Sequence, residues 1–302
     1  MKQILIILFL FLHSTLWALS SELAYSEIVT TEEINNSKCI TEEELIIKIN
    51  NEENITLLDT SCVTDMSYVL ANTQDDSKCI TREQLIEKIN NQENLTFLNT
   101  SCITDMSYLF AQVKDFNQNI GAWDVSSVTS MEGMFLQASS FNQDISNWDV
   151  SKVTNMKLMF NGAYAFNLPL TAWDVSSVTD MSSIFMMAVA FNQPLNEWDV
   201  SSVSNMNEMF KHAHAFNQDI NNWDVSHVTS MSLMFQDAHA FNQPLNNWDI
   251  SNVKTMHFMF INAYKFQQTL YDWDISDVKE SRSFAKNTTL DKDDNPFLLL
   301  SN

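Results

Sequence analysis

The pattern of apolar and polar residues repeats every 25 residues through the second two-thirds of the chain. The segment FNQDISNWDV at 141–150 returns as FNQPLNEWDV at 191–200. The most regular part of the pattern is a Trp-Asp pair, which begins at residues 123, 148, 173, 198, 223, 248 and 273. A fixed period of this length predicts stacked repeats, in which each unit buries its apolar side chains against its neighbours.

Two hydrophobic periods follow one another within each repeat. Apolar and polar residues alternate from Trp148 to Val150, which is typical of a short strand. Apolar residues then recur at steps of three and four, at Val153, Met156, Met159, Phe160 and Ala163. This second spacing predicts a short helix with Thr154 as its N-cap. The sequence therefore predicts an α/β repeat solenoid, with one short parallel strand and one short helix in each 25-residue coil.

The N-terminal third contains a different duplication, in which the segment at 37–66 matches the segment at 77–106. Each copy opens with a capping box, which predicts a short amphipathic helix after Thr41 and after Thr81. Because the copies look like repeats with an inserted helix, we expect them to cap the stack. The expected divisions are a signal peptide at 1–20, a linker at 21–36, an N-terminal cap at 37–115, the repeat array at 116–279, and a C-terminal cap or tail at 280–302.

Four cysteines, Cys39, Cys62, Cys79 and Cys102, all lie in these two copies. An even number of cysteines in an exported chain predicts disulfides. The equal spacing within the copies favours the pairs Cys39–Cys62 and Cys79–Cys102, while a Cys62–Cys102 bond would join equivalent positions of adjacent units. Zinc binding is disfavoured, because the cysteines form no CxxC pair and no His is close to them in the sequence.

The formal net charge of −22 disfavours binding to nucleic acid and to anionic membranes. The N-terminus carries Lys2, an apolar run at 4–12 and small residues at 18–20, which together predict a cleaved secretory signal. The apolar run is short for a membrane span of roughly 20 residues, and no later stretch is long enough. We therefore expect an exported protein, secreted or held at the cell surface, without a membrane span after cleavage; a periplasmic location is the alternative.

The repeat also resembles a known family. The pattern IxxWxVSxVTxMxxMFxxA at 145–163 is similar to the 25-residue repeat of the BspA-like leucine-rich-repeat surface proteins of bacteria, and the similarity covers roughly residues 98–279. This resemblance implies a leucine-rich-repeat-like solenoid. It also implies a secreted or surface-attached protein that acts in adhesion and host contact.

Stacked repeats would align the Asp residues that follow each Trp in one column: Asp124, Asp149, Asp174, Asp199, Asp224, Asp249 and Asp274. Parallel strands would bring neighbouring carboxylates to about 4.8 Å, at a cost on the order of 1 kcal/mol per pair in water. Hydrogen bonds from the following Ser residues and from turn N–H groups would offset that cost. The alternative is bound Ca²⁺ or a basic partner.

Other columns are interpreted as structural. The Trp residues are expected in the core, with each indole N–H bonded to a neighbouring coil. The Asn residues that follow each Phe are expected to form a ladder that satisfies backbone groups. His214 and His239 are weak candidates for a metal site, but Tyr164, Val189 and Tyr264 hold the equivalent positions, which favours a variable surface position.

No arrangement of residues typical of a catalytic site stands out from the repeated background. The sequence therefore predicts a non-enzymatic protein without a cofactor, which binds an extracellular protein or glycan through its regular strand face. The candidate contacts are six members of the Asp column and four residues that precede a Trp: Asp124, Asp149, Asp174, Asp199, Asp224, Asp249, Asn147, Glu197, Asn222 and Asn247. The alternative is a structural or divalent-cation-binding envelope protein, in which the same Asp column holds calcium.

Overall fold

The computed structural model describes residues 39–50, 58–64, 79–96, 98–290 and 295–299. The chain divides into two compact units, Met1–Ser77 and Lys78–Asn302. The described helices are α2 (Glu42–Asn50) in the first unit, and α4 (Arg82–Asn90) and α5 (Pro296–Leu299) in the second. The expected signal peptide and linker lie outside the described residues.

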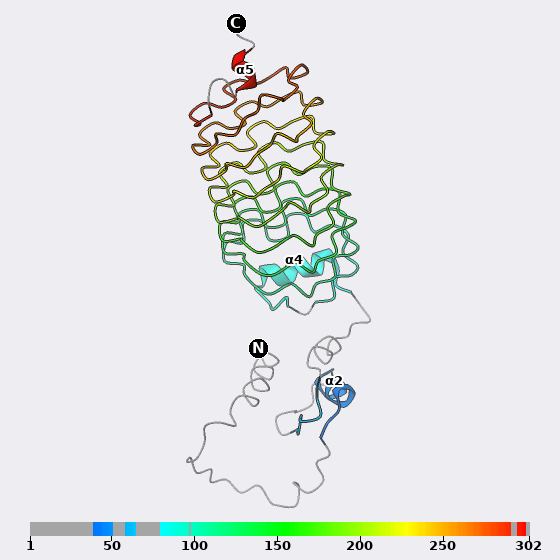
Figure 1. Cartoon of the computed structure of the whole chain (residues 1–302). Helices are drawn as coiled ribbons and strands as arrows, with labels where there is room; N and C mark the ends of the chain where they lie inside the picture. Colours follow the sequence, from blue (N-terminus) through cyan, green and yellow to red (C-terminus); the bar gives the residue numbers. More distant parts are fainter. Residues whose placement is uncertain (1–38, 51–57, 65–78, 97, 291–294, 300–302) are drawn as a thin grey trace, which may run out of the picture. The chain divides into compact units, whose positions relative to one another are not determined.

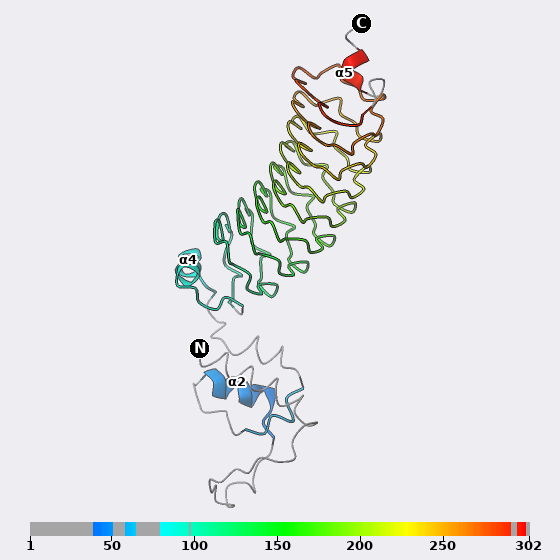
Figure 2. The same cartoon turned by 90° about the vertical axis from the view of Figure 1, so that its left-hand side faces the viewer.

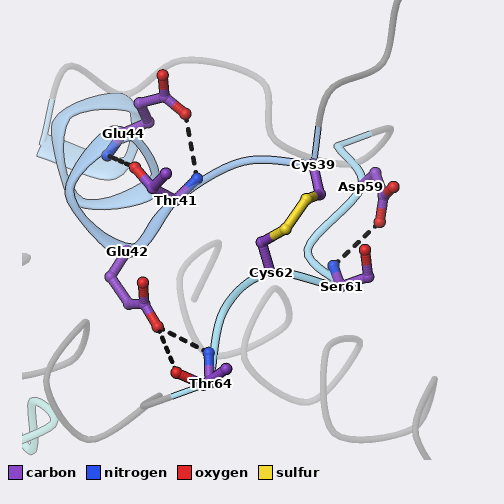
Figure 3. Close-up of a disulfide and its surroundings, with 8 residues drawn as sticks. All are labelled: Cys39, Thr41, Glu42, Glu44, Asp59, Ser61, Cys62 and Thr64. Atoms are coloured by element: carbon purple, nitrogen blue, oxygen red, sulfur yellow. Dashed lines mark hydrogen bonds between the residues drawn. A yellow bond between two sulfur atoms is a disulfide. The ribbon is translucent and has the colours of Figure 1, made fainter.

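Helix α2 begins with the capping box that the sequence predicts (Figure 3). The N–H of Thr41 donates to Glu44 Oε2 at 3.1 Å, and the N–H of Glu44 donates to Thr41 Oγ1 at 3.3 Å. Glu42 accepts two further hydrogen bonds, from the N–H and the hydroxyl of Thr64, at 2.7 and 2.9 Å. Leu45 is fully buried. The helix is therefore fixed at its N-terminus by polar contacts and along one face by its apolar side chains.

The structure joins Cys39 to Cys62 and Cys79 to Cys102, the pairing that the spacing favoured, with Cα–Cα distances of 5.5 and 5.7 Å. The first bond closes the segment that contains α2 (Figure 3), and the second closes the segment that contains α4. Each disulfide therefore ties one inserted helix to the turn that follows it in the same copy of the duplication.

The second unit is a stack of coils, seen as successive layers between α4 and α5 in Figures 1 and 2. Seven coils each begin with a buried or nearly buried Phe, at residues 116, 141, 166, 191, 216, 241 and 266. Isolated parallel bridges join equivalent residues of neighbouring coils, as between Asn155 and Asp180. One continuous core of Phe, Trp, Met, Val, Ile, Leu and Ala side chains runs through the stack.

The predicted strand and helix in each coil were wrong, and so was the α/β class. The described residues contain no strand beyond the isolated bridges, and no helix between α4 and α5. Where a helix beginning after Thr154 was expected, the N–H groups of Leu158 and Phe160 instead donate to the next coil, at 2.9 Å each. The N–H of Met159, which lies between them, donates back three residues to Met156 O, at 3.2 Å. The segment is thus a run of turns, bonded to its neighbour at alternate residues.

Left-handed residues maintain this run of turns. Positive φ angles recur in pairs four residues apart, for example 60° at Leu158 with 71° at Gly162, and 58° at Glu208 with 57° at His212. A left-handed residue bends the backbone away from both the extended and the right-handed helical path. This conformation explains why neither regular element forms although the apolar spacing fits a helix.

The coils are closer together on the hydrogen-bonded side than on the side that carries the Trp residues. Equivalent rings lie nearly parallel, so the distance between their centroids measures the local separation of coils. Phe135 and Phe160, in the bonded segment, are 5.5 Å apart, whereas Trp148 and Trp173 are 6.5 Å apart. The coils therefore spread toward the Trp side.

Side chains, rather than backbone ladders, join the coils on that wider side. The indole N–H of Trp148 donates to Ile120 O at 3.2 Å, and the Trp residues at 123, 173, 198, 223, 248 and 273 repeat this bond. The side chain of Asn142 accepts the N–H of Asn167 at 3.0 Å, and the same ladder continues along the array. The structural interpretation of both columns is confirmed.

Both ends of the stack are closed within the chain. At the first end, the guanidinium of Arg82 in α4 donates to Asp105 O at 3.1 Å and to Ser107 O at 2.6 Å. At the other end, the ring of Phe284 packs edge-on against Phe260, with an interplanar angle of 82°, and so interrupts the column of parallel rings. Such caps cover backbone and apolar surface that another coil would otherwise have covered.

Candidate functional site

The Asp column lies on the wider side of the stack, and we call this surface the Trp–Asp edge. It comprises the buried Trp residues and the exposed carboxylates of Asp124, Asp149, Asp174, Asp199, Asp224, Asp249 and Asp274. Each carboxylate uses Oδ1 to accept the N–H of the Ser two residues later, at 3.0–3.1 Å. At Asp149 and Asp174, for example, the Ser hydroxyl also donates to Oδ1, at 2.6 Å.

These hydrogen bonds are the ones that the sequence suggested as the offset for neighbouring charges. They stabilise the ionised form, so the pKa is lowered at Asp149, Asp199, Asp224 and Asp249, chiefly by the Ser side chain and then by its backbone N–H. At Asp274 the backbone hydrogen bond of Ser276 is the main cause of the lowered pKa. The turns therefore favour the charged form of these five carboxylates.

One position shows that the turn does not require the charge. Asn99 precedes the first array coil at the position equivalent to the Asp column. Its Oδ1 accepts the N–H of Ser101 at 3.1 Å and the Ser101 hydroxyl at 2.7 Å. An amide oxygen thus makes the same turn, and the negative charge is a separate property of the column.

On this side of the stack, neighbouring coils are not spaced as paired parallel strands would be. The indole centroids of neighbouring coils are 6.4–6.5 Å apart in four measured pairs. Because each Asp directly follows its Trp, we infer that the carboxylates repeat at about this interval rather than at the expected 4.8 Å. The wider interval weakens the repulsion between neighbours, which varies inversely with distance.

The other predicted contacts lie on the same side, in the turn before each Trp. Asn147, Glu197, Asn222 and Asn247 are all exposed. The side-chain amide of Asn247 donates to Asn222 Oδ1 at 3.5 Å, which places these two polar groups side by side. The Trp–Asp edge is therefore a regular, exposed and acidic surface with interspersed amides.

The two candidate histidines are in contact, but not as metal ligands. The rings of His214 and His239 stack face to face, with centroids 4.5 Å apart and an interplanar angle of 7°. Imidazole nitrogens bind metals in the plane of the ring, and parallel stacked rings do not direct two such nitrogens to one point. Within the described ranges, no three His, Cys, Asp or Glu side chains are grouped so that they could hold a metal ion.

The sequence interpretation missed two partners of these histidines. His212 and Asp237 are 25 residues apart, and the structure places His212 Nδ1 at 3.6 Å from Asp237 Oδ2. His239 Nε2 lies 4.0 Å from Asp237 Oδ1. Comparing residues at the same repeat position would have paired His212 with Asp237, but it would not have revealed that two neighbouring columns converge.

A comparison with known families matches the description "Mycoplasma protein of unknown function, DUF285", at residues 81–198 and 186–296. The two matches together span residues 81–296, which is more than half of the 302-residue chain. The chain belongs to the DUF285 family. The match begins at the capping box of α4 and ends at α5, so it corresponds to the stack and both its caps.

No curated protein and no solved structure matches the chain. The DUF285 description assigns no function, and it neither supports nor opposes the resemblance to BspA-like proteins. In the part of the chain that the structure describes, no helix combines the length and the apolar character needed to cross a membrane.

Proposed function

We propose that this DUF285 protein is an exported binding protein without enzymatic activity, and that its Trp–Asp edge binds a basic segment of an extracellular protein. The proposal rests on the Asp column, in which seven exposed carboxylates are held by identical Asp–Ser turns. We infer that these carboxylates repeat at about the 6.4–6.5 Å interval of the indoles. The two disulfides support an oxidising location outside the cytoplasm.

Charge complementarity favours a basic partner. Each Asp uses Oδ1 for its own turn, which leaves Oδ2 to accept a hydrogen bond from a Lys or Arg side chain. The net charge of −22 would also attract a basic partner over longer distances. A role in adhesion or host contact, which the resemblance to BspA-like proteins implies, is part of this proposal.

The interval along the edge indicates the conformation of the bound segment. An extended chain rises 3.2–3.4 Å per residue, so alternate side chains, which point to the same side, are about 6.4–6.8 Å apart. This distance matches the 6.4–6.5 Å between neighbouring indoles. The edge is therefore suited to an extended segment that carries Lys or Arg at every second position.

The test compares two synthetic peptides of identical composition, one with Lys alternating with Thr and the other with all Lys residues grouped together. Fluorescence anisotropy at low salt gives both affinities. We expect the alternating peptide to bind more tightly, and its affinity to fall steeply with added salt, because exposed charges are screened.

The protein variants separate the edge from general electrostatics. The triple variant D149N/D174N/D199N removes three charges and retains the turns, as Asn99 does. The control E43Q/E83Q/E87Q removes three charges from α2 and α4. We expect the first variant to weaken binding about tenfold or more and the control to change it little. Equal loss in both variants, or equal binding of both peptides, would contradict the proposal.

A further inference from the structure

Three histidines and one aspartate form a compact group in and just after the hydrogen-bonded segment of neighbouring coils. His212 and His214 belong to coil 191–215, while Asp237 and His239 belong to coil 216–240. The ring of His214 stacks on His239 at 4.5 Å and meets the ring of His212 edge-on, at 6.2 Å and 84°. His214 therefore lies between two other imidazoles.

The histidine group also contacts residues of coil 241–265. The ring of His239 stacks on Tyr264, with centroids 5.0 Å apart, and Asn262 donates its side-chain amide to Asp237 Oδ1 at 2.9 Å. The contacts thus connect three successive coils. The nearby Lys211 is paired with Glu208 at 2.8 Å, so its charge is offset on its own coil.

The carboxylate of Asp237 lies close to two of the three imidazoles, those of His212 and His239. Asp237 lies within 3.6 Å of His212 and 4.0 Å of His239, and can stabilise a proton on either of them. No ion pair of this kind is described for His214. A proton on His214 would therefore lie next to two imidazoles that can themselves be protonated. The carboxylate of Asp237 is more distant and would stabilise that proton only weakly.

We propose that this histidine group is a proton-sensitive joint, and that protonation of His214 in mildly acidic surroundings loosens the contact between coils 191–215, 216–240 and 241–265. A proton on His214 places a positive charge between the rings of His239 and His212. Partial desolvation there disfavours the charged form, and a proton on either neighbour would repel it. The device acts on the middle and later coils and leaves the caps at both ends unchanged.

The direction of the titration agrees with the geometry. His214 is exposed at the surface, but partial desolvation, followed by the neighbouring His239 and His212, lowers its pKa below the usual value, against a smaller opposite effect of Asp237. The folded protein then binds fewer protons at this site than the unfolded chain does. Stability is therefore fully present above the ordinary His pKa of about 6.5, and it is lost as the pH falls through the lowered value.

The chain itself supplies a matched variant. Tyr164 and Tyr264 occupy the position of His214 in other coils, so H214Y keeps an aromatic ring in the column and removes the titrating group. We expect the melting temperature of the wild type to fall between pH 7.5 and pH 5.5 by about 2–4 °C more than that of H214Y. The pair His257–Glu280 contributes equally to both proteins.

A second variant should shift the pH dependence in the opposite direction. D237N retains an oxygen that can accept from Asn262 and removes the charge that raises the pKa of His214. We expect its melting temperature to fall more steeply with acid than that of the wild type. Opposite effects of H214Y and D237N would not arise from a purely structural role.

Histidine resonances, followed by NMR between pH 8 and pH 5, provide the direct measurement. We expect His214 to titrate below its ordinary value. As it does so, the protection of backbone amides in coils 191–265, taken relative to the intrinsic exchange rate at each pH, should decrease. A His214 that titrates at or above the ordinary value would overturn the proposal. So would a wild type and an H214Y variant whose melting temperatures respond identically to pH.

Discussion

Trp173 lies parallel to Trp148, with ring centroids 6.5 Å apart, on the side of the stack where no backbone ladder joins neighbouring described coils. Its indole N–H crosses to the carbonyl of Ile145 at 3.0 Å. A large aromatic side chain thus spans an interval that is too wide for the 4.7–4.9 Å spacing of paired strands. The Trp side chains therefore fill the space between neighbouring coils, and their indole N–H groups form hydrogen bonds from one coil to the next.

We therefore expect W173F to destabilise the protein by about 2–3 kcal/mol, because it removes buried volume and one of the two donors to the Ile145 carbonyl, the other being the N–H of Trp148. The melting temperature should fall by several degrees. The exposed neighbour Thr171 provides the control, since T171A should change the free energy of unfolding by less than about 0.5 kcal/mol. A W173F protein as stable as T171A would show that the indole contact is dispensable.

The Asp–Ser turns predict a specific response to acid. The Ser hydrogen bonds hold the pKa of Asp149, Asp199 and Asp224 below that of the unfolded chain. The stability that they contribute is therefore present above the unfolded value of about 3.9, and it is lost as the pH falls through the lower folded value. Melting temperatures recorded from pH 6 to pH 2.5 should decline mainly below pH 4.

A non-titrating variant identifies the residues responsible for that decline. D149N/D199N/D224N keeps an oxygen acceptor in each turn, as Asn99 does, and it should show a shallower decline below pH 4 than the wild type. If the two proteins lose stability in parallel, carboxylates outside the edge control the acid response.

The sequence predicted those features that follow from side-chain type and period. Buried columns such as Trp148 with Trp173, the two capping boxes and the pairing of Cys79 with Cys102 all depend on residues that have one preferred environment or partner. The Asp–Ser turn was suggested for the same reason, because Asp and Ser two residues apart readily form it.

The path of the backbone could not be predicted in the same way. Apolar steps of three and four fit a helix, but they fit a series of turns equally well, and the left-handed residues include Leu158 and Phe258 rather than glycine alone. The separation of coils depends on what fills each column: Trp173 on the wide side, but Ala163 and Ala188 beside the bonded segment. Such differences arise from packing in three dimensions, not from the period.

The N-terminal end of the stack depends on Arg82. Its guanidinium donates to two carbonyls, Asp105 O and Ser107 O, that face the end of the array. We expect R82A to cost about 1.5–3 kcal/mol, since it removes charged donors from both carbonyls. Amide exchange should increase at residues 104–112.

R82K provides the comparison for that prediction. Lysine supplies a charge but not the planar fork that reaches two acceptors, so we expect R82K to be intermediate between R82A and the wild type. If amide exchange at residues 104–112 in R82A equals that of the wild type, Arg82 is not part of the cap.

Glycine should stabilise the folded protein at left-handed positions that now hold a residue with a Cβ atom. Gln137 is exposed and has a φ angle of 57°, a conformation that costs a residue with a Cβ atom roughly 1–2 kcal/mol. Comparing Q137G with Q137A cancels the loss of the Gln side chain, and we expect the glycine variant to be more stable by about 1 kcal/mol in denaturant unfolding. At Ser140, which is exposed and is not among the positive-φ residues, the order should reverse, with S140A more stable than S140G. The same order at both positions would mean that the turns of the stack do not rely on left-handed residues.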